Sequence, residues 1–200
     1  MDVKDTREQI VDSGADLMWR RGYGRTSVDD IIREAGVCKG SFYHYFTSKE
    51  ALGLAVIDRW TAHFGAHIQA HLSPQRAPEE NLHGILDAFV AAQEESGYLG
   101  CPLGRLALEM GDVSEDLRSA VQAGFDGLRE IFTQHLRAAG MPEETALEQG
   151  RYMLATLEGA LMLEKVRGGG EVLHSLVATM KTDVSRRLVE LAVEQAVVKV

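Results

Sequence analysis

The stretch TSVDDIIREAGVCKGSFYHYFTSKE, residues 26–50, decides the fold of the chain. Ser27 is a good N-cap, and Asp30 three residues later completes a capping arrangement. Val28 to Ala35 then carries apolar side chains at helical spacing. Gly36 follows at the point where the helix must stop, because glycine enters the left-handed region at no steric cost. The pattern predicts a short helix that ends in a tight turn.

A second short helix is predicted from Lys39 to Phe46, directly after this turn. One side of it is polar, and Gly40 removes bulk from that side. Two short helices joined by a tight glycine turn form the unit that places its second helix in the major groove of DNA. The stretch therefore predicts a helix-turn-helix.

The same stretch resembles the TetR family of bacterial transcriptional repressors, over residues 10–55. The residues that carry the resemblance are Arg21-Gly22-Tyr23, Thr26-Ser27-Val28, Ala35-Gly36-Val37, Gly40, Phe42-Tyr43-His44-Tyr45-Phe46 and Ser48-Lys49-Glu50. The resemblance implies an N-terminal three-helix DNA-binding domain followed by a helical domain for ligand binding and dimerisation. Cys38 departs from the family, which usually has serine there, and a thiol is a poorer cap.

Composition favours an all-α protein. The chain has 200 residues, only four prolines, and 45% hydrophobic residues, which suits one or two soluble domains. Its two cysteines suggest no disulfide framework. No apolar run approaches the roughly 20 residues that cross a bilayer, and the charged N-terminus is unlike a signal peptide. We expect a cytoplasmic location and no membrane association.

The formal net charge of −9 is unusual for a DNA-binding protein. Residues 1–60 hold nine Lys/Arg and ten Asp/Glu, a sum of −1, while residues 61–200 hold twelve and twenty, a sum of −8. The acidity therefore lies mainly in the C-terminal part. DNA affinity must then depend on the local placement of individual basic side chains.

About nine helices are expected, with no strand pattern. The first covers Lys4–Arg21, and a capping box of Thr47 and Glu50 starts a long helix that ends near His71. Later helices are expected over residues 79–95, in a short segment that ends at Met110, from Ser114 to about Ala139, from the Gly140-Met141-Pro142 break to Arg167, and over residues 172–198. Glycine and proline separate these helices. The expected domains are residues 1–48 for DNA binding and residues 49–200 for ligand binding and dimerisation.

The last two helices are predicted to form a homodimer interface. Their apolar positions are Leu154, Leu157, Leu161, Met162, Leu173, Leu176, Val177, Met180, Val184, Leu188 and Leu191. This spacing is close to that of a coiled-coil seam. The alternative is that these side chains fill the core of the protomer itself.

Eight residues are candidates for contact with double-stranded operator DNA: Thr26, Ser27, Lys39, Gly40, Ser41, Tyr43, His44 and Lys49. Hydroxyls, ammonium groups and helix starts suit phosphate oxygens, and side chains in the first turn of a recognition helix reach base edges. The alternative for Tyr43 and His44 is packing within the small domain.

A small-molecule effector pocket is predicted from aromatic, Met and thiol side chains in the C-terminal part. The candidates are Trp60, His63, Phe89, Tyr98, Cys101, Met110, Phe125, Phe132 and Tyr152. Few polar groups accompany them, which suits an apolar or aromatic ligand. No cofactor is indicated. His63, His67 and His71 follow one helix at four-residue spacing, but nothing beside them completes a metal site.

The predicted function is a ligand-responsive DNA-binding regulator, most simply a repressor that an effector releases from a palindromic operator. One alternative is a repressor that senses oxidants or electrophiles through Cys101. Another is an all-α enzyme, but no nucleophile–base motif, phosphate loop or cofactor fingerprint is present.

Overall fold

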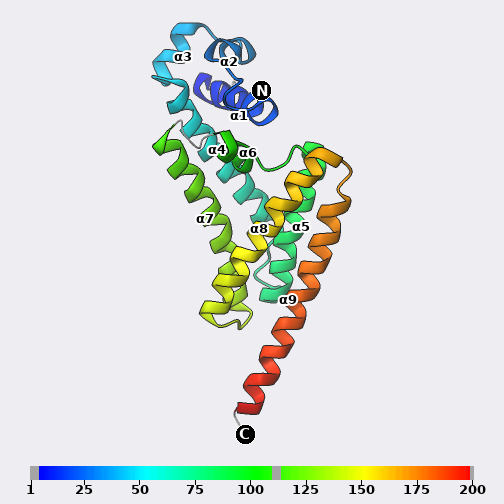
Figure 1. The fold of residues 1–200 in the computed structure, drawn as a ribbon. Helices are drawn as coiled ribbons and strands as arrows, with labels where there is room; N and C mark the ends of the chain where they lie inside the picture. Colours follow the sequence, from blue (N-terminus) through cyan, green and yellow to red (C-terminus); the bar gives the residue numbers. More distant parts are fainter. Residues whose placement is uncertain (1–4, 110–113, 199–200) are drawn as a thin grey trace. The chain divides into compact units, whose positions relative to one another are not determined.

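The computed structural model describes residues 5–109 and 114–198, and every element in these ranges is an α-helix (Figure 1). The helices, in chain order, are α1 (Thr6–Arg21), α2 (Val28–Ala35), α3 (Lys39–Tyr45), α4 (Lys49–Ala70), α5 (Pro78–Ser96), α6 (Pro102–Glu109), α7 (Glu115–Ala138), α8 (Glu143–Arg167) and α9 (Glu171–Val198). The all-α prediction is confirmed. None of the described helices is long and apolar enough to cross a membrane.

The helices form two compact units. The first contains residues 1–64 and 101–124, and the second contains residues 65–100 and 125–200. Both α4 and α7 pass from one unit into the other, because their ranges span these limits. The functional boundary expected after residue 48 stays a prediction.

The local signals at the start of the chain act as predicted. Ser27 caps α2: its hydroxyl accepts the Asp30 N–H at 3.1 Å, while the Ser27 N–H donates to the Asp30 carboxylate at 3.2 Å. Gly36 ends α2 with a φ of 66°. The capping box predicted at Thr47 is wrong, because α4 begins at Lys49 and the Ser48 hydroxyl accepts the Ala51 N–H at 3.0 Å.

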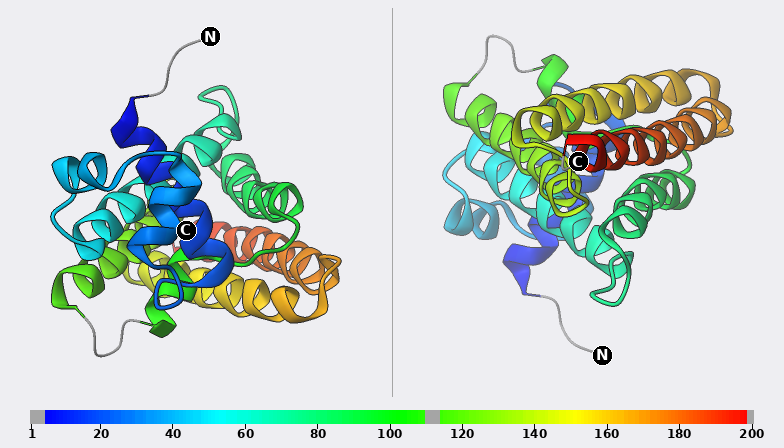
Figure 2. Two further views of the ribbon diagram at one scale, coloured as in Figure 1. Left: turned by 90° about the horizontal axis from the view of Figure 1, so that it is seen from above. Right: turned by 90° about the horizontal axis from the view of Figure 1, so that it is seen from below.

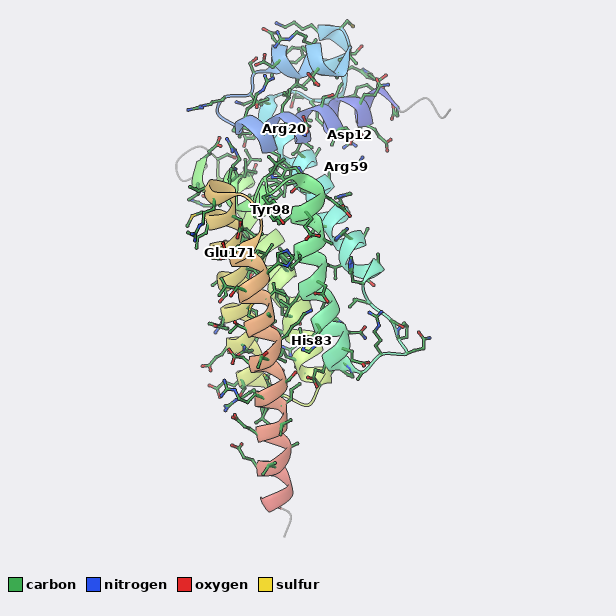
Figure 3. The ribbon with its side chains drawn as sticks, turned by 90° about the vertical axis from the view of Figure 1, so that its right-hand side faces the viewer. Asp12, Arg20, Arg59, His83, Tyr98 and Glu171 are labelled. Atoms are coloured by element: carbon green, nitrogen blue, oxygen red, sulfur yellow. The ribbon has the colours of Figure 1, made fainter. Side chains whose placement is uncertain are left out.

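The core of the first unit is built from side chains of α1, α2, α3 and α4. Its fully buried side chains include Ile10, Met18, Ile31, Phe42, Leu52 and Ile57. Gly14 allows α1 to approach α4, since a Cβ at this position would lie 3.0 Å from a Leu52 methyl group. Asp12 of α1 and Arg59 of α4 also form an ion pair, with 2.6 Å between the carboxylate oxygen and the guanidinium nitrogen (Figure 3).

The second unit is built on α5, α8 and α9. Helices α8 and α9 run side by side, and α9 also packs against α5 (Figures 1 and 2). Phe89 of α5 stacks on Phe132 of α7, with 5.8 Å between ring centroids. The final helices thus supply much of this unit's apolar core.

The interface predicted for the last two helices needs correction. Six of the predicted positions are buried within the protomer: Leu157, Leu161, Leu173, Val177, Met180 and Val184. These residues face the chain's own core because α8 and α9 pack on each other and α9 packs on α5. Among the side chains that the structure describes on these helices, the large apolar ones that are exposed are Tyr152, Met162, Leu163, Val166, Val189 and Val193.

One buried carboxylate fixes the turn between α8 and α9. Glu164, only 1% exposed, accepts the N–H groups of Gly170 at 2.9 Å, Val172 at 2.5 Å and Leu173 at 3.2 Å. These donors are the otherwise unpaired amides at the start of α9. Burial on its own would raise the pKa of Glu164, but the three backbone donors outweigh it and the pKa lies below its usual value.

A tyrosine side chain closes over the same turn. Gly170 has a φ of 80°, and a Cβ there would collide with the Tyr98 ring. Tyr98 itself lies in the left-handed region, with a φ of 61°. Figure 3 shows its side chain close to the start of α9, which is marked by Glu171.

Replacing the buried carboxylate tests its role in the second unit. We expect Glu164→Gln to lower the unfolding temperature at pH 7 by roughly 5 °C, because an amide turns its own N–H toward backbone donors. A group whose pKa is depressed on folding stabilises above its unfolded pKa and loses that effect as pH falls. The difference between the two proteins should therefore shrink below about pH 4.

Glu171→Gln is the matched control, since Glu171 starts the same helix but is exposed. Thermal unfolding followed by circular dichroism gives the comparison. Equal unfolding temperatures for Glu164→Gln and wild type at pH 7 would contradict this role.

Candidate nucleic-acid interface

Helix α3 presents two opposite faces. Phe42 and Phe46 are buried, and their rings lie 6.0 Å apart between centroids. Lys39, Gly40, Tyr43 and His44 are exposed. Positions i, i+1, i+4 and i+5 lie on one side of a helix, so these four residues share the outer face of α3.

The side chains of the outer face make only weak contacts with the rest of the chain. The Lys39 ammonium lies 3.5 Å from the Asp29 carboxylate, and both side chains are well exposed. Tyr43 is 49% exposed, and its ring meets the Phe42 ring edge-on at 5.2 Å between centroids. Exposed ion pairs contribute little to stability. The outer face of α3 can therefore exchange these contacts for contacts with a ligand.

Cys38 precedes α3 and gives it no side-chain cap, as expected for a thiol. Its sulfur instead lies 3.1 Å from the Ser41 hydroxyl. Hydrogen bonding with Ser41 lowers the pKa of the Cys38 thiol. Ser41 is partly buried beside it, so this predicted contact residue is less accessible than its neighbours on the outer face.

Two of the predicted contact residues, Thr26 and Lys49, use their polar groups in hydrogen bonds within the chain. Thr26 is 1% exposed, and its hydroxyl donates to the Gly22 carbonyl at 2.7 Å. Lys49 donates from its ammonium to the Tyr23 carbonyl at 3.0 Å and lies 4.1 Å from the centre of the Tyr23 ring. Burial lowers the pKa of Lys49, while the Glu109 carboxylate opposes that shift. Ser27 remains exposed at the start of α2.

Glu109 was not anticipated from the sequence. It lies at the end of α6 and accepts the Gly24 N–H at 2.8 Å, across 85 positions of the chain. Its other oxygen is 3.4 Å from the Arg105 guanidinium. No local pattern signals such a contact, because neither helical periodicity nor a turn motif connects residues so far apart.

The predicted pocket residues have different surroundings. Trp60, Phe89 and Phe132 are buried, whereas Tyr98, Cys101 and Phe125 are partly buried. His63 and Tyr152 are exposed, and Met110 lies outside the described residues. The structure brings Phe89 and Phe132 into contact within the second unit. An effector pocket stays a prediction.

The Cys101 sulfur has a structural contact at the start of α6. It accepts the Gly104 N–H at 3.3 Å, which is the position of an N-capping side chain. Cys38 and Cys101 do not form a disulfide.

Comparisons with known proteins agree with this geometry. The family described as "Bacterial regulatory proteins, tetR family" matches residues 10–56. The family described as "Transcriptional regulator LmrA/YxaF-like, C-terminal domain" matches residues 78–179. The first match covers the helix-turn-helix, and the second runs from the start of α5 to the first turns of α9.

Individual relatives match over most of their length. An uncharacterised HTH-type transcriptional regulator of Lactococcus lactis is 32% identical over 183 residues, covering 90% of this chain and 93% of that protein. The HTH-type transcriptional repressor NemR of Escherichia coli is 30% identical over 191 residues, covering 88% and 92%.

Solved structures share the fold. The crystal structure of regulatory protein TetR from Rhodobacter sphaeroides gives a TM-score of 0.80 at 27% identity, covering 88% of this chain and 96% of that one. The crystal structure of the reduced form of Escherichia coli NemR gives a TM-score of 0.77 at 29% identity, covering 89% and 96%. With the helix-turn-helix, the all-helical second unit and these matches together, the chain belongs to the TetR family of bacterial transcriptional regulators.

Proposed function

We propose that this regulator is a homodimeric repressor that binds a palindromic operator and releases it when a small apolar or aromatic molecule binds. The outer face of α3 carries the proposal, because it offers a cation, a phenol and an imidazole at helical spacing while the opposite face is buried. Its relative NemR is described as a repressor. Relatives described as transcriptional regulators also disfavour the enzymatic alternative.

In this proposal the outer face of α3 enters the major groove. Lys39 lies in the first turn of this face and meets base edges, Ser41 reaches them from the rim of the face, and Gly40 lets the backbone approach the DNA. Tyr43 and His44 lie one turn later and meet the phosphate backbone, together with Ser27 at the start of α2. Basic side chains are few on this surface, so we expect moderate non-specific affinity.

Pairing of two copies through α8 and α9 is supported by an exposed apolar stripe. On α8, Tyr152, Gly159 and Val166 follow at seven-residue intervals, and Val166 is 85% exposed. A Cβ added at Gly159 would meet no atom within 4 Å, which places this glycine on the open side of the helix. Such patches on helices mark protein–protein contacts.

Helix α9 continues the stripe. Between residues 185 and 194 no side chain is buried, although Leu188, Val189, Leu191 and Val193 are apolar. Figure 1 shows these turns extending past the ends of α5 and α8. Unsupported helical turns are marginal in water, so a second copy is the partner that would cover them. A two-fold dimer then presents two recognition helices to two half-sites.

Removing one hydroxyl tests the DNA-facing role of α3. We expect Tyr43→Phe to raise the Kd for operator roughly fivefold, because it deletes one phosphate contact and keeps the ring that packs on Phe42. The loss should be the same for operator variants of different sequence. Fluorescence anisotropy with labelled duplexes measures it.

Tyr45→Phe is the matched control, because Tyr45 is also on α3 and is 38% exposed but lies outside the face formed by residues 39, 40, 43 and 44. We expect it to bind operator like wild type. Equal effects of the two substitutions would contradict the assigned face.

The effector is expected to act without covalent chemistry. It must bind the DNA-free arrangement more tightly than the DNA-bound one, since affinity alone shifts no equilibrium. Titration of the operator complex with aromatic compounds under reducing conditions should release DNA from wild type and from Cys101→Ser equally.

The thiol alternative gives the opposite result. In that case only oxidants or electrophiles release the operator from wild type, and Cys101→Ser keeps its DNA in their presence. Such an outcome would replace the noncovalent effector with modification of Cys101.

A further inference from the structure

One peptide group in the first unit is held between two charged side chains. The Tyr23 carbonyl accepts the Lys49 ammonium at 3.0 Å, and the Gly24 N–H donates to the Glu109 carboxylate at 2.8 Å. This carbonyl and this N–H belong to the same amide, and in a trans peptide they point in opposite directions. The ammonium and the carboxylate therefore approach one amide from its two sides. We call Lys49, the Tyr23–Gly24 peptide and Glu109 the peptide clamp.

Both hydrogen bonds of the peptide clamp are charge-assisted. Such bonds are stronger than neutral ones, and an ammonium on the carbonyl polarises the amide so that its N–H becomes a better donor. The Lys49 ammonium also lies over the Tyr23 ring, at 4.1 Å from its centre, which adds a cation–π contact. Each half of the clamp thus strengthens the other.

The clamp ties three elements together at the start of α2. The peptide lies in the loop between α1 and α2, Lys49 is the first residue of α4, and Glu109 is the last residue of α6. The rest of the loop is also held, because Thr26 donates its hydroxyl to the Gly22 carbonyl. Three residues after the peptide, Ser27 caps α2. The loop therefore sets where α2 begins, and α3 follows α2 through the Gly36 turn.

Gly22 shows how closely Glu109 approaches this loop. Its φ is 97°, and a Cβ at this position would collide with the Glu109 carboxylate. Glu109 is also paired with Arg105, one helical turn earlier. The carboxylate is therefore oriented from its own helix before it meets the Gly24 N–H.

We propose that the peptide clamp positions α2 and α3 for operator binding, and that Lys49 serves this binding as a positioning residue and not as a phosphate contact. The proposal rests on the operator binding proposed above. It assigns to Glu109, which lies 85 positions from Gly24 in the chain, a role in DNA affinity. Two residues that share one amide should then behave as one unit.

A double-mutant cycle tests the proposal on an operator selected by the wild-type protein. The variants are Lys49→Met, Glu109→Ala and the double variant, each measured by anisotropy at several salt concentrations. We expect each single substitution to raise Kd roughly tenfold. The double variant should be no more than about twofold weaker than either single one, because the second change removes a clamp already broken.

The salt dependence separates positioning from phosphate contact. A lysine that neutralises a phosphate contributes about 0.9 to the slope of log Kd against log salt. We expect the slope to stay at its wild-type value in Lys49→Met, because the ammonium faces the Tyr23 carbonyl. A slope that falls by about 0.9 per protomer in Lys49→Met, but stays unchanged in Glu109→Ala, would show that Lys49 neutralises a phosphate. That result would overturn the clamp.

Two further variants control for charge and for hydrogen bonding. Glu115→Ala removes an equal charge from the exposed first turn of α7, where Glu115 pairs with Arg118, and we expect wild-type DNA binding. Glu109→Gln keeps an oxygen that accepts the Gly24 N–H, and we expect it to recover at least half of the affinity lost in Glu109→Ala. Additive losses, or equal effects of Glu109→Ala and Glu115→Ala, would overturn the proposal.

Hydrogen exchange of the Gly24 amide gives a readout that needs no DNA. The amide should exchange slowly in wild type and faster in Lys49→Met, although this substitution leaves its acceptor Glu109 in place. Unchanged exchange in Lys49→Met would overturn the clamp even if Glu109→Ala fails to fold. Absence of any DNA binding by wild type would instead refute the proposed operator function, and the exchange result would still test the clamp.

Discussion

Burial of the Phe42 side of α3 is the constraint on which the outer face of this helix depends. A seven-residue helix is too short to be stable alone, so α3 exists because Phe42 and Phe46 are inserted into the core of the first unit. Once that side is fixed, helical geometry turns residues 39, 40, 43 and 44 outward. The exposed chemistry of α3 is thus a consequence of packing on its opposite face.

Carboxylates satisfy backbone donors at two turns of the chain. Glu109 accepts the Gly24 N–H in the loop before α2, and Glu164 accepts three amides at the start of α9. Glu164 acts where Gly170 offers no capping side chain, whereas Glu109 holds a loop whose following helix keeps its own cap at Ser27. Glycine makes room at both turns: a Cβ at Gly22 would collide with the Glu109 carboxylate, and one at Gly170 would collide with the Tyr98 ring.

Local signals in the sequence predicted the helices well, because caps and breakers act over a few residues. The capping box of Ser27 and Asp30, the left-handed Gly36 and the cap at Ser114 all formed as expected. The side of each helix that faces the core was harder to predict. The Leu and Val stripe of α9 suits a partner or a core equally well, and only the packing of α5 against α9 shows that Val177 and Val184 face inward.

The candidate site was predictable where it depends on one helix and not where it depends on distant contacts. Tyr43 and His44 follow from helical periodicity, and both are exposed. Lys49 was predicted as a phosphate ligand from its place at a helix start, and that role stays a prediction, but the sequence did not indicate that its ammonium donates to the Tyr23 carbonyl. The partner that completes this arrangement, Glu109, comes from α6, and no pattern within either segment reveals it.

We propose that two copies of this chain present paired recognition helices to DNA. Selection of bound duplexes from a random-sequence pool, followed by light scattering of the selected complex, tests it most directly. We expect an inverted repeat with two equivalent half-sites that binds two chains of 22.0 kDa each. Failure to enrich any sequence, or enrichment of an unsymmetrical site that binds a single chain, would contradict it.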